Sequence, residues 1–269
     1  MTRATIWFFC VLIVFSSAAF AQDDDTVLQP AQPDFTLAAL PTSLRLPQFK
    51  SAFRVTHRFT RPLSCDTCAT NLLEDFFGLD SGAQIGLEYR FGIVRNVEVG
   101  IHRTSDKTIE FFGQYGVVRQ GAQLPVDVSV LLSIDGTNNF RDEHSPAFGL
   151  LLSRTVGDQA AVYVEPIFVH HSNVFQQATI ADDNTFMIGL GARLRVRPTV
   201  YIVGEFTPRV SGYEPGVNQG SVGIEKRAGG HMFQLNFSNS FGTTIGQIAR
   251  GGPSGSNWYM GFNITRKFF

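Results

Sequence analysis

The chain has 269 residues, of which 43% are hydrophobic and only 17% are charged, and its formal net charge is −1. Soluble domains usually carry charge on about a quarter of their residues, so this chain is poor in the charges that cover a soluble surface. Binding to nucleic-acid phosphates requires clustered positive charge, and the sequence contains no basic face, so no nucleic-acid partner is expected.

The chain begins with the three parts of a secretory signal peptide. Arg3 supplies the positive charge, residues 6–15 form an apolar run, and Ala19-Phe20-Ala21 supplies the small residues of a cleavage site. The apolar run is shorter than the ~20 residues that a membrane-spanning helix needs, so an uncleaved anchor is the weaker alternative. We predict that residues 1–21 are a signal peptide, cleaved after Ala21.

The next segment, residues 22–47, has an acidic start and then contains Pro and Ala without any repeating pattern. A segment of this composition is typical of flexible chain. We therefore expect 22–47 to be a flexible periplasmic segment that precedes the folded domain, residues 48–269.

Two cysteines, Cys65 and Cys68, remain after Cys10 is removed with the signal peptide. Disulfides persist in the compartment that an exported chain enters. Haem attachment would need His at position 69, which is Ala; a redox site would need a βαβ context; and zinc would need two further ligands. We predict a small structural disulfide between Cys65 and Cys68, with no metal and no cofactor.

From residue 49 onward, apolar residues alternate with small or polar residues over stretches of about 9 to 13 residues, as in barrel strands. In the second stretch, Ile85, Leu87, Tyr89 and Phe91 face one side, and Gln84, Gly86, Glu88 and Arg90 face the other. The pattern predicts about 12 strands. They lie near 49–60, 82–92, 95–104, 107–119, 124–134, 145–155, 158–171, 184–197, 199–207, 217–227, 229–239 and 257–269.

The connections between these stretches alternate in length. Short connections lie near 93–94, 120–123, 156–157, 198 and 228. Long polar connections lie near 61–81, 135–144, 172–183, 208–216 and 240–256, and the turn at 105–106 is a short member of this long set. Short periplasmic turns and long outer loops are typical of outer-membrane barrels. We predict an all-β fold: a closed, up-and-down antiparallel transmembrane β-barrel in the outer membrane of a Gram-negative-type bacterium.

The last strand ends in Phe268 and Phe269. A terminal aromatic residue after an alternating strand is the usual signal for the barrel assembly machinery, which we expect as a partner together with outer-membrane lipid. The alternation places Phe268, and not Phe269, in the lipid-facing row.

If the apolar rows face lipid, the opposite rows face the lumen. The predicted lumen-lining residues are Glu88, Arg90, Glu98, His102, Glu110, Gln114, Asp127, Glu165, Arg193, Arg195, Glu205, Glu225, Gln234, Asn236 and Lys267. About 12 strands enclose a narrow space, so these side chains are expected to pair across it. They could form the constriction of a small-solute channel or a polar filling that stabilises the barrel, and the sequence leaves both open.

A possible catalytic group lies at the end of the seventh stretch. His170, Ser172 and Asn184 share the lipid-facing parity, so His170 could accept the proton of Ser172 while Asn184 orients the imidazole. The spacing resembles the His-x-Ser-Asn stretch of outer-membrane phospholipase A, which implies attack on a lipid acyl ester. Such short motifs arise easily by chance. Polar residues at the membrane boundary are the favoured interpretation, and a lipid acyl hydrolase is the alternative.

Longer landmarks resemble one uncharacterised bacterial family of outer-membrane β-barrels, a domain of unknown function. They are Leu44-Arg45-Leu46-Pro47, His57-Arg58-Phe59, residues 76–80, residues 107–110, residues 204–209 and residues 229–235. The resemblance spans roughly residues 44 to 269 and implies the barrel fold, with no activity. We therefore expect an outer-membrane barrel that is a narrow small-solute channel or a structural or binding component of the envelope, and not an enzyme.

Overall fold

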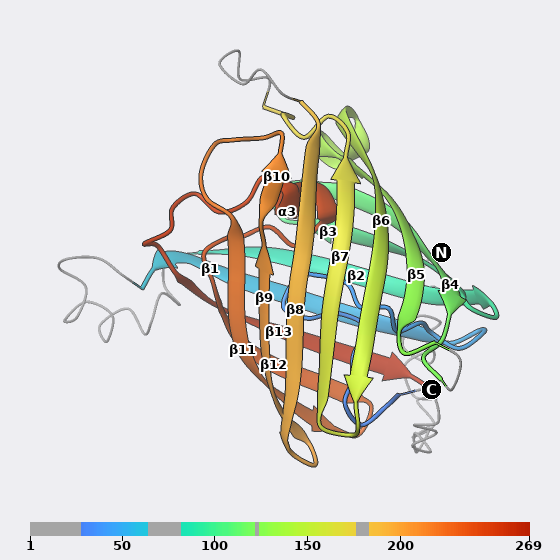
Figure 1. Ribbon diagram of the computed structural model, residues 1–269. Helices are drawn as coiled ribbons and strands as arrows, with labels where there is room; N and C mark the ends of the chain where they lie inside the picture. The colour runs from blue at the N-terminus through green and yellow to red at the C-terminus, as the bar shows by residue number, and fades with distance from the viewer. Residues whose placement is uncertain (1–27, 64–81, 122–123, 176–182) are drawn as a thin grey trace, which may run out of the picture.

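The computed structural model describes residues 28–63, 82–121, 124–175 and 183–269 (Figure 1). The predicted signal peptide and the predicted Cys65–Cys68 disulfide lie outside these residues. None of the helices in the described ranges has the length and apolar character needed to cross a membrane.

Long strands make up the wall. They are β1 (Ser51–Pro62), β2 (Ala83–Val94), β3 (Val97–Thr104), β4 (Ile109–Val118), β5 (Asp127–Gly136), β6 (Asp142–Val156), β7 (Ala160–Val169), β8 (Thr185–Arg197), β9 (Val200–Thr207), β11 (Gln219–Ala228), β12 (His231–Ser238) and β13 (Tyr259–Phe268). Three short elements lie in the connections: α2 (Thr137–Phe140), β10 (Arg209–Ser211) and α3 (Ile245–Ala249).

These strands form a closed ring. Each pairs antiparallel with its neighbours along the chain, and β1 closes the ring by pairing with β13, where Val55 lies opposite Ile264. The short β10 lies outside the ring and pairs with β8. The closed antiparallel barrel of 12 strands is therefore confirmed, and every predicted strand is present with boundaries shifted by a few residues.

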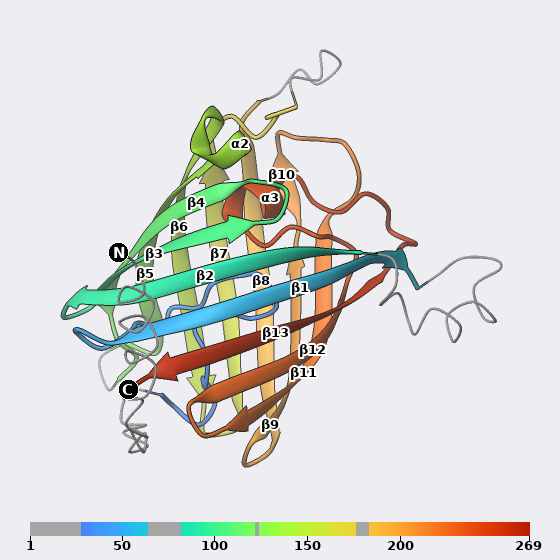
Figure 2. The same cartoon turned by 180° about the vertical axis from the view of Figure 1, so that it is seen from behind.

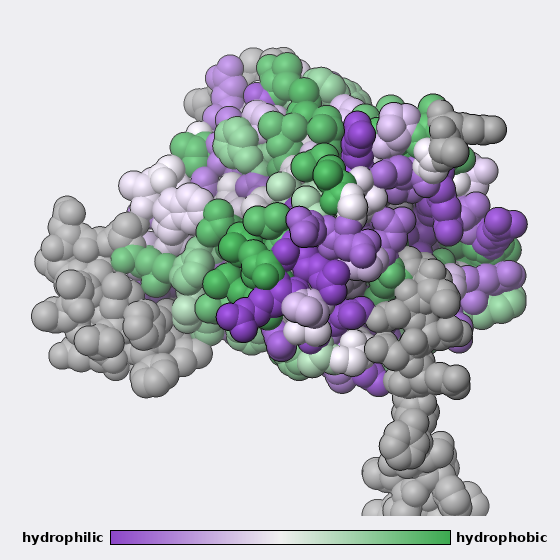
Figure 3. All heavy atoms as spheres, turned by 60° about the horizontal axis from the view of Figure 1, so that its bottom comes forward, coloured by the Kyte–Doolittle hydropathy of each residue, from purple (hydrophilic) through white to green (hydrophobic). Residues whose placement is uncertain are grey.

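The two ends of the barrel differ. At one end the connections are brief turns, such as those at Gly157 and Gly229, which both have positive φ. The other end carries the longer connections, including α2 and α3 (Figures 1 and 2). We call these the short-turn end and the long-loop end. Figure 3, which brings the short-turn end forward, shows polar and apolar side chains in separate patches there.

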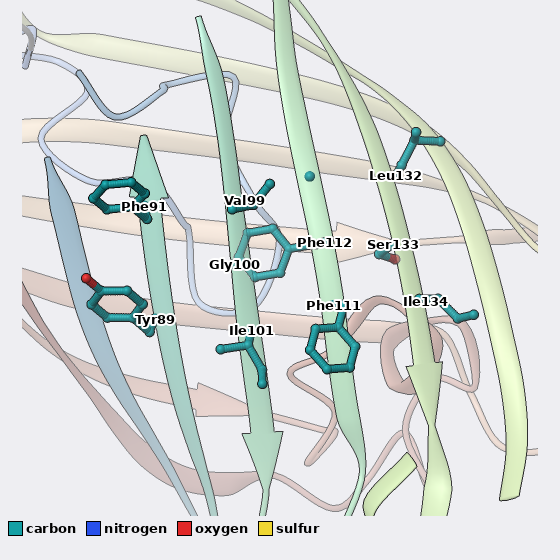
Figure 4. A pocket seen from close by; sticks show the side chains of 11 residues that line it. Tyr89, Phe91, Val99, Gly100, Ile101, Phe111, Phe112, Leu132, Ser133 and Ile134 are labelled. Carbon is teal, nitrogen blue, oxygen red and sulfur yellow. The ribbon is translucent and has the colours of Figure 1, made fainter. Parts of the chain in front are cut away.

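The outside of the wall is apolar. Exposed large side chains occur on nearly every strand, among them Leu87, Ile101, Phe148, Phe168, Ile202 and Leu235. A hollow of about 690 Å³ crosses β2 to β5, because Gly113 leaves a gap between Val99 and Leu132 (Figure 4). Such a surface fits the acyl chains of a bilayer.

Residues 28–47 lie inside the barrel, and we call them the plug. Figures 1 and 2 both show this blue segment within the ring of strands. Phe35, Leu37, Leu40 and Leu46 are each 2% exposed or less. This differs from the flexible periplasmic segment expected over 22–47. Wall groups hold the plug, so its order depends on residues far away in the sequence.

Candidate functional site in the barrel lumen

The middle of the plug, residues 37–40, is a tight turn that we call its tip, and this tip rests on one carboxylate. Leu37 N donates to Leu40 O at 2.8 Å and Thr42 N to Phe35 O at 2.8 Å, which folds the segment back on itself. At the tip, the backbone N–H groups of Ala38, Ala39 and Leu40 donate to Glu205 at 3.0 to 3.1 Å. Hydrogen bonds to a charged acceptor are stronger than neutral ones, so Glu205 is the main anchor of the tip.

Wall side chains also bind the plug's carbonyl oxygens. Ala38 O accepts from Arg58 Nη2 at 3.1 Å and from Asn263 Nδ2 at 2.8 Å. Thr36 O accepts from Arg193 Nη2 at 2.6 Å, and Pro33 O accepts from Lys267 Nζ at 2.5 Å. Polar lumen residues thus satisfy many of the plug's backbone groups, in addition to the few hydrogen bonds within the plug itself.

Glycines on the inner face make room for the plug. A Cβ at Gly191 would lie 2.2 Å from Leu37 Cδ1, and one at Gly116 would lie 1.7 Å from the Arg45 guanidinium. At Gly92 the conflict is with backbone, since a Cβ would lie 2.1 Å from Pro47 O. The inner wall is therefore complementary in shape to the plug.

Ion pairs crosslink the wall beside the plug. Glu88 pairs with both Arg54 and Arg90, and Arg90 continues to Glu98 at 2.8 Å. Glu98 also accepts the plug's Leu46 N–H at 2.8 Å. On the other side of the lumen, Arg193 donates to both oxygens of Glu225 at 2.7 and 2.9 Å. These pairs join side chains on the same strand or on nearby strands of the wall, and pairing lowers the cost of burying their charges.

The long-loop end is closed by α3. Thr244 caps this helix and forms a capping box with Gln247, and its hydroxyl donates to Asp135 at 2.6 Å. Ile245 N donates to Glu110 at 3.1 Å. The apolar residues of α3 belong to the same buried cluster as Leu37 and Leu40 of the plug.

The cavities along the plug are small. Three cavities lined by plug residues have volumes of about 40, 20 and 10 Å³, which is room for a few waters at most. Plug, α3 and wall side chains together fill the lumen in this structure.

Most of the predicted lumen-lining residues point inward. Those that are 7% exposed or less are Glu88, Arg90, Glu98, His102, Glu110, Gln114, Asp127, Glu165, Arg193, Glu205, Glu225, Gln234, Asn236 and Lys267. Arg195 differs from the prediction: it is only half-buried at the short-turn end and donates to Pro198 O at 3.1 and 3.2 Å. Arg195 still pairs in register with the buried Tyr201, so the alternation holds here, and its exposure reflects its place near the end of β8, just before the bulge between Arg195 and Arg197.

The sequence did not predict that lumen residues bind the plug, and two inward-facing arginines were also missed. Arg54 and Arg58 lie on the inner face of β1 and are buried, but they were not among the predicted set. Their alternation with Val55 and His57 in the same strand was the signal that could have identified them.

The predicted serine group is only partly assembled. His170 Nδ1 and Asn184 Oδ1 lie 2.5 Å apart, as the prediction requires. Ser172 is fully buried instead, and its hydroxyl bonds to Asp183 O at 3.1 Å and Thr185 Oγ1 at 2.8 Å. His171 has a left-handed backbone with φ 56°, which breaks the alternation between His170 and Ser172. Within the described residues, Ser172 and His170 share no hydrogen bond.

The neighbouring His171 contacts two carboxylates. Its Nε2 lies 2.6 Å from Glu143 Oε2, and its Nδ1 bonds to Asp183. These hydrogen bonds, first to Glu143 and then to Asp183, raise the pKa of His171 above its ordinary value. Sequence reasoning singled out His170 and not this residue.

Comparison with known proteins now adds to the geometry. Residues 37–268 match the family described as a membrane-bound β-barrel domain (DUF5777). The chain belongs to this family. The matched range begins at the tip of the plug, and the family resemblance seen in the sequence is confirmed.

Solved outer-membrane proteins share the barrel fold of this chain. The NanC porin has a TM-score of 0.54 at 5% identity, covering 82% of this chain and 100% of that one. The KdgM porin has a TM-score of 0.50 at 7% identity, covering 82% and 99%. Outer-membrane phospholipase A from Escherichia coli has a TM-score of only 0.44 at 10% identity, covering 81% of this chain and 90% of that one. A likeness this distant says nothing about the role of Ser172. No curated protein matches the chain.

Proposed function

We propose that this outer-membrane barrel is a narrow small-solute channel that its own N-terminal plug holds closed. The observation that carries the proposal is the polar, form-fitted seat of the plug. The plug tip rests on Glu205, and inner-wall glycines such as Gly191 leave space for it. Glycine weakens a strand by about 0.5–1 kcal/mol relative to Ala, so a barrel that needed only a filled interior would gain from side chains there.

The same seat remains polar when the plug leaves. Glu205, Arg193, Gln234 and Asn263 all bind plug backbone and would face water in an open lumen. Such a lining, with both charge signs in a narrow barrel, forms a mixed-charge constriction for small polar solutes. The likeness to two porins concerns the fold alone, but it supports a fold that can carry solutes.

The plug can be locked by a disulfide. The hydroxyl groups of Ser43 in the plug and Ser153 in β6 are in hydrogen-bond contact, so their side chains are close enough to be bridged. We would make Ser43→Cys/Ser153→Cys in a background carrying Cys65→Ser and Cys68→Ser, so that only the new pair can be oxidised. Single-channel conductance in planar bilayers is then recorded before and after reduction.

We expect conductance steps in the reduced protein and none in the oxidised protein. The conductance of both single-cysteine variants should be the same with and without reductant. Equal conductance in the oxidised and reduced states, with the disulfide verified by mass, would show that solutes bypass the plug. Absence of steps in every state, even when Glu205→Gln loosens the tip, would leave a closed structural barrel. Fluorophosphonate should not label Ser172 in either state, because its hydroxyl is buried and turned away from His170.

A further inference from the structure

A separate hollow lies at the long-loop end beside α3. It has a volume of about 400 Å³, which is within the range of small-molecule sites. The β3–β4 turn, the loop after β10 and the chain that follows α3 form its sides. Three rings line it, those of Phe175, Tyr213 and Phe241, and most of its surface is apolar.

One cation in this lining, Arg250, is only partly paired. It follows α3 directly, and its Nη1 has no hydrogen-bond partner among the described residues, although the carboxylates of Asp135 and Asp106 attract its charge. The guanidinium carbon lies 5.5 Å from the centre of the Phe175 ring, which is a cation–π contact. Arg250 is half-buried, and a guanidinium nitrogen buried without an acceptor is costly, so a charged acceptor that reaches this guanidinium is favoured.

The nearby acidic group is already satisfied. Asp106 Oδ2 accepts from Gln247 at 2.9 Å and from Gln84 at 3.3 Å. Its Oδ1 accepts from Thr104 Oγ1 and, at 3.1 Å, from Thr108 N. Asp106 therefore lies in the lining without serving as the acceptor of Arg250.

A second arginine adds positive charge to this end. Arg209 Nη1 donates to the carbonyls of Tyr213 and Pro215 at 2.7 and 2.8 Å, and to that of Arg250 at 3.2 Å. Arg209 thus fixes the loop that carries Tyr213, and its charge favours an anion nearby. Aromatic rings and a guanidinium with no hydrogen-bonded acceptor in one small cavity match a ligand with a flat apolar body and one carboxylate.

We propose that this hollow binds a small ring-bearing carboxylate, with the guanidinium of Arg250 as its anchor. The site goes beyond the channel function and does not depend on it. Neutral compounds of the same shape can fill the apolar part but leave Arg250 Nη1 without a charged acceptor, so charge decides the affinity.

The test uses 4-fluorobenzoate and neutral 4-fluorobenzamide as matched probes, observed by ¹⁹F NMR on the full mature barrel in detergent micelles. Saturable, protein-dependent binding separates the site from partition into micelles. We expect the carboxylate to bind at least about tenfold more tightly than the amide. Absence of saturable 4-fluorobenzoate binding, or equal binding of the two probes, overturns the proposal.

Variants assign the binding to the hollow. Arg250→Gln should weaken 4-fluorobenzoate binding at least about tenfold, and Arg250→Lys should weaken it less because the charge remains. Arg141→Gln, which removes an exposed arginine at the same end, should leave it unchanged. Unchanged affinity in a folded Arg250→Gln barrel overturns the assignment. Measuring the oxidised Ser43→Cys/Ser153→Cys barrel as well keeps failure of the site distinct from failure of the channel.

Discussion

Two lumen carboxylates, Glu165 on β7 and Glu205 on β9, are both buried but differ in their partners. Glu205 accepts three backbone N–H groups of the plug tip and the Gln219 side chain at 2.7 Å. Both oxygens of Glu165 lack a hydrogen-bond partner among the described residues. The same substitution should therefore have opposite consequences at the two positions.

We expect Glu205→Gln to lower the free energy of unfolding by about 1–3 kcal/mol, because the plug tip loses its charged acceptor. Glu165→Gln should leave the stability unchanged or raise it by up to about 1 kcal/mol, because it replaces a buried carboxyl group that has no hydrogen-bond partner. Urea unfolding in micelles measures both, with exposed Glu214→Gln as the neutral control. Equal losses at Glu165 and Glu205 would contradict an explanation based on partners.

His171 gives the long-loop end a dependence on pH. Because hydrogen bonds to Glu143 and Asp183 raise its pKa in the folded protein, the protonated form stabilises the loop. This contribution is fully present below the unfolded pKa of about 6.5 and is lost as the pH rises through the raised folded pKa.

An NMR titration should therefore place the midpoint of His171 above about 6.5, and Glu143→Gln should lower it by removing the main cause. Proteolysis of this loop should be slower at acid pH than at alkaline pH in the native chain, and His171→Gln should abolish the difference. His231→Gln, at the short-turn end, serves as the control. A pH difference that survives His171→Gln would assign the effect to another group.

At the scale of the elements, the fit between strand β2 and the plug can be tested with a pair of glycines. Gly92 faces inward under Pro47, whereas Gly113 on β4 faces the outer hollow, where a Cβ would have no neighbour closer than 3.7 Å. Gly92→Ala must displace plug backbone and should cost about 1–3 kcal/mol of unfolding free energy. Gly113→Ala should be neutral or stabilising. Loss of stability in both variants, measured by urea unfolding, would indicate that the strands do not tolerate Ala at either glycine, with or without contact to the plug.

The strands could be predicted because alternation is local: each side chain reports on lipid or lumen through its neighbours two residues away. The plug could not be predicted, because its contacts join distant positions, such as Thr265 with Asp34 and Gln32 with Ser153. When a segment has no periodicity, its own sequence does not indicate which surface it packs against. Local geometry also overrode the pattern at His171, where one left-handed residue turned Ser172 away from His170.

At the scale of the whole molecule, the polarity is reversed relative to a soluble protein, with apolar side chains outside and charges within. The plug and the C-terminal strand meet at the short-turn end of the barrel. Lys267 binds Pro33 O, and the Phe269 ring lies 6.5 Å from that of Phe35. Closure of the wall and seating of the plug thus share the last residues of the chain.

The two terminal phenylalanines should therefore separate assembly from closure. Phe268 is 52% exposed on the outer face, as the alternation predicted, whereas Phe269 packs beside the plug. Phe268→Ala should slow insertion by the assembly machinery and leave the urea midpoint of the purified barrel unchanged. Phe269→Ala should lower the unfolding free energy by about 1–2 kcal/mol and increase plug opening, because it removes apolar burial from Phe35. Pulse-chase insertion assays, unfolding and single-channel recording measure these effects. Slow insertion of Phe269→Ala with an intact plug would assign the signal to the last residue and make Phe268 an ordinary lipid contact.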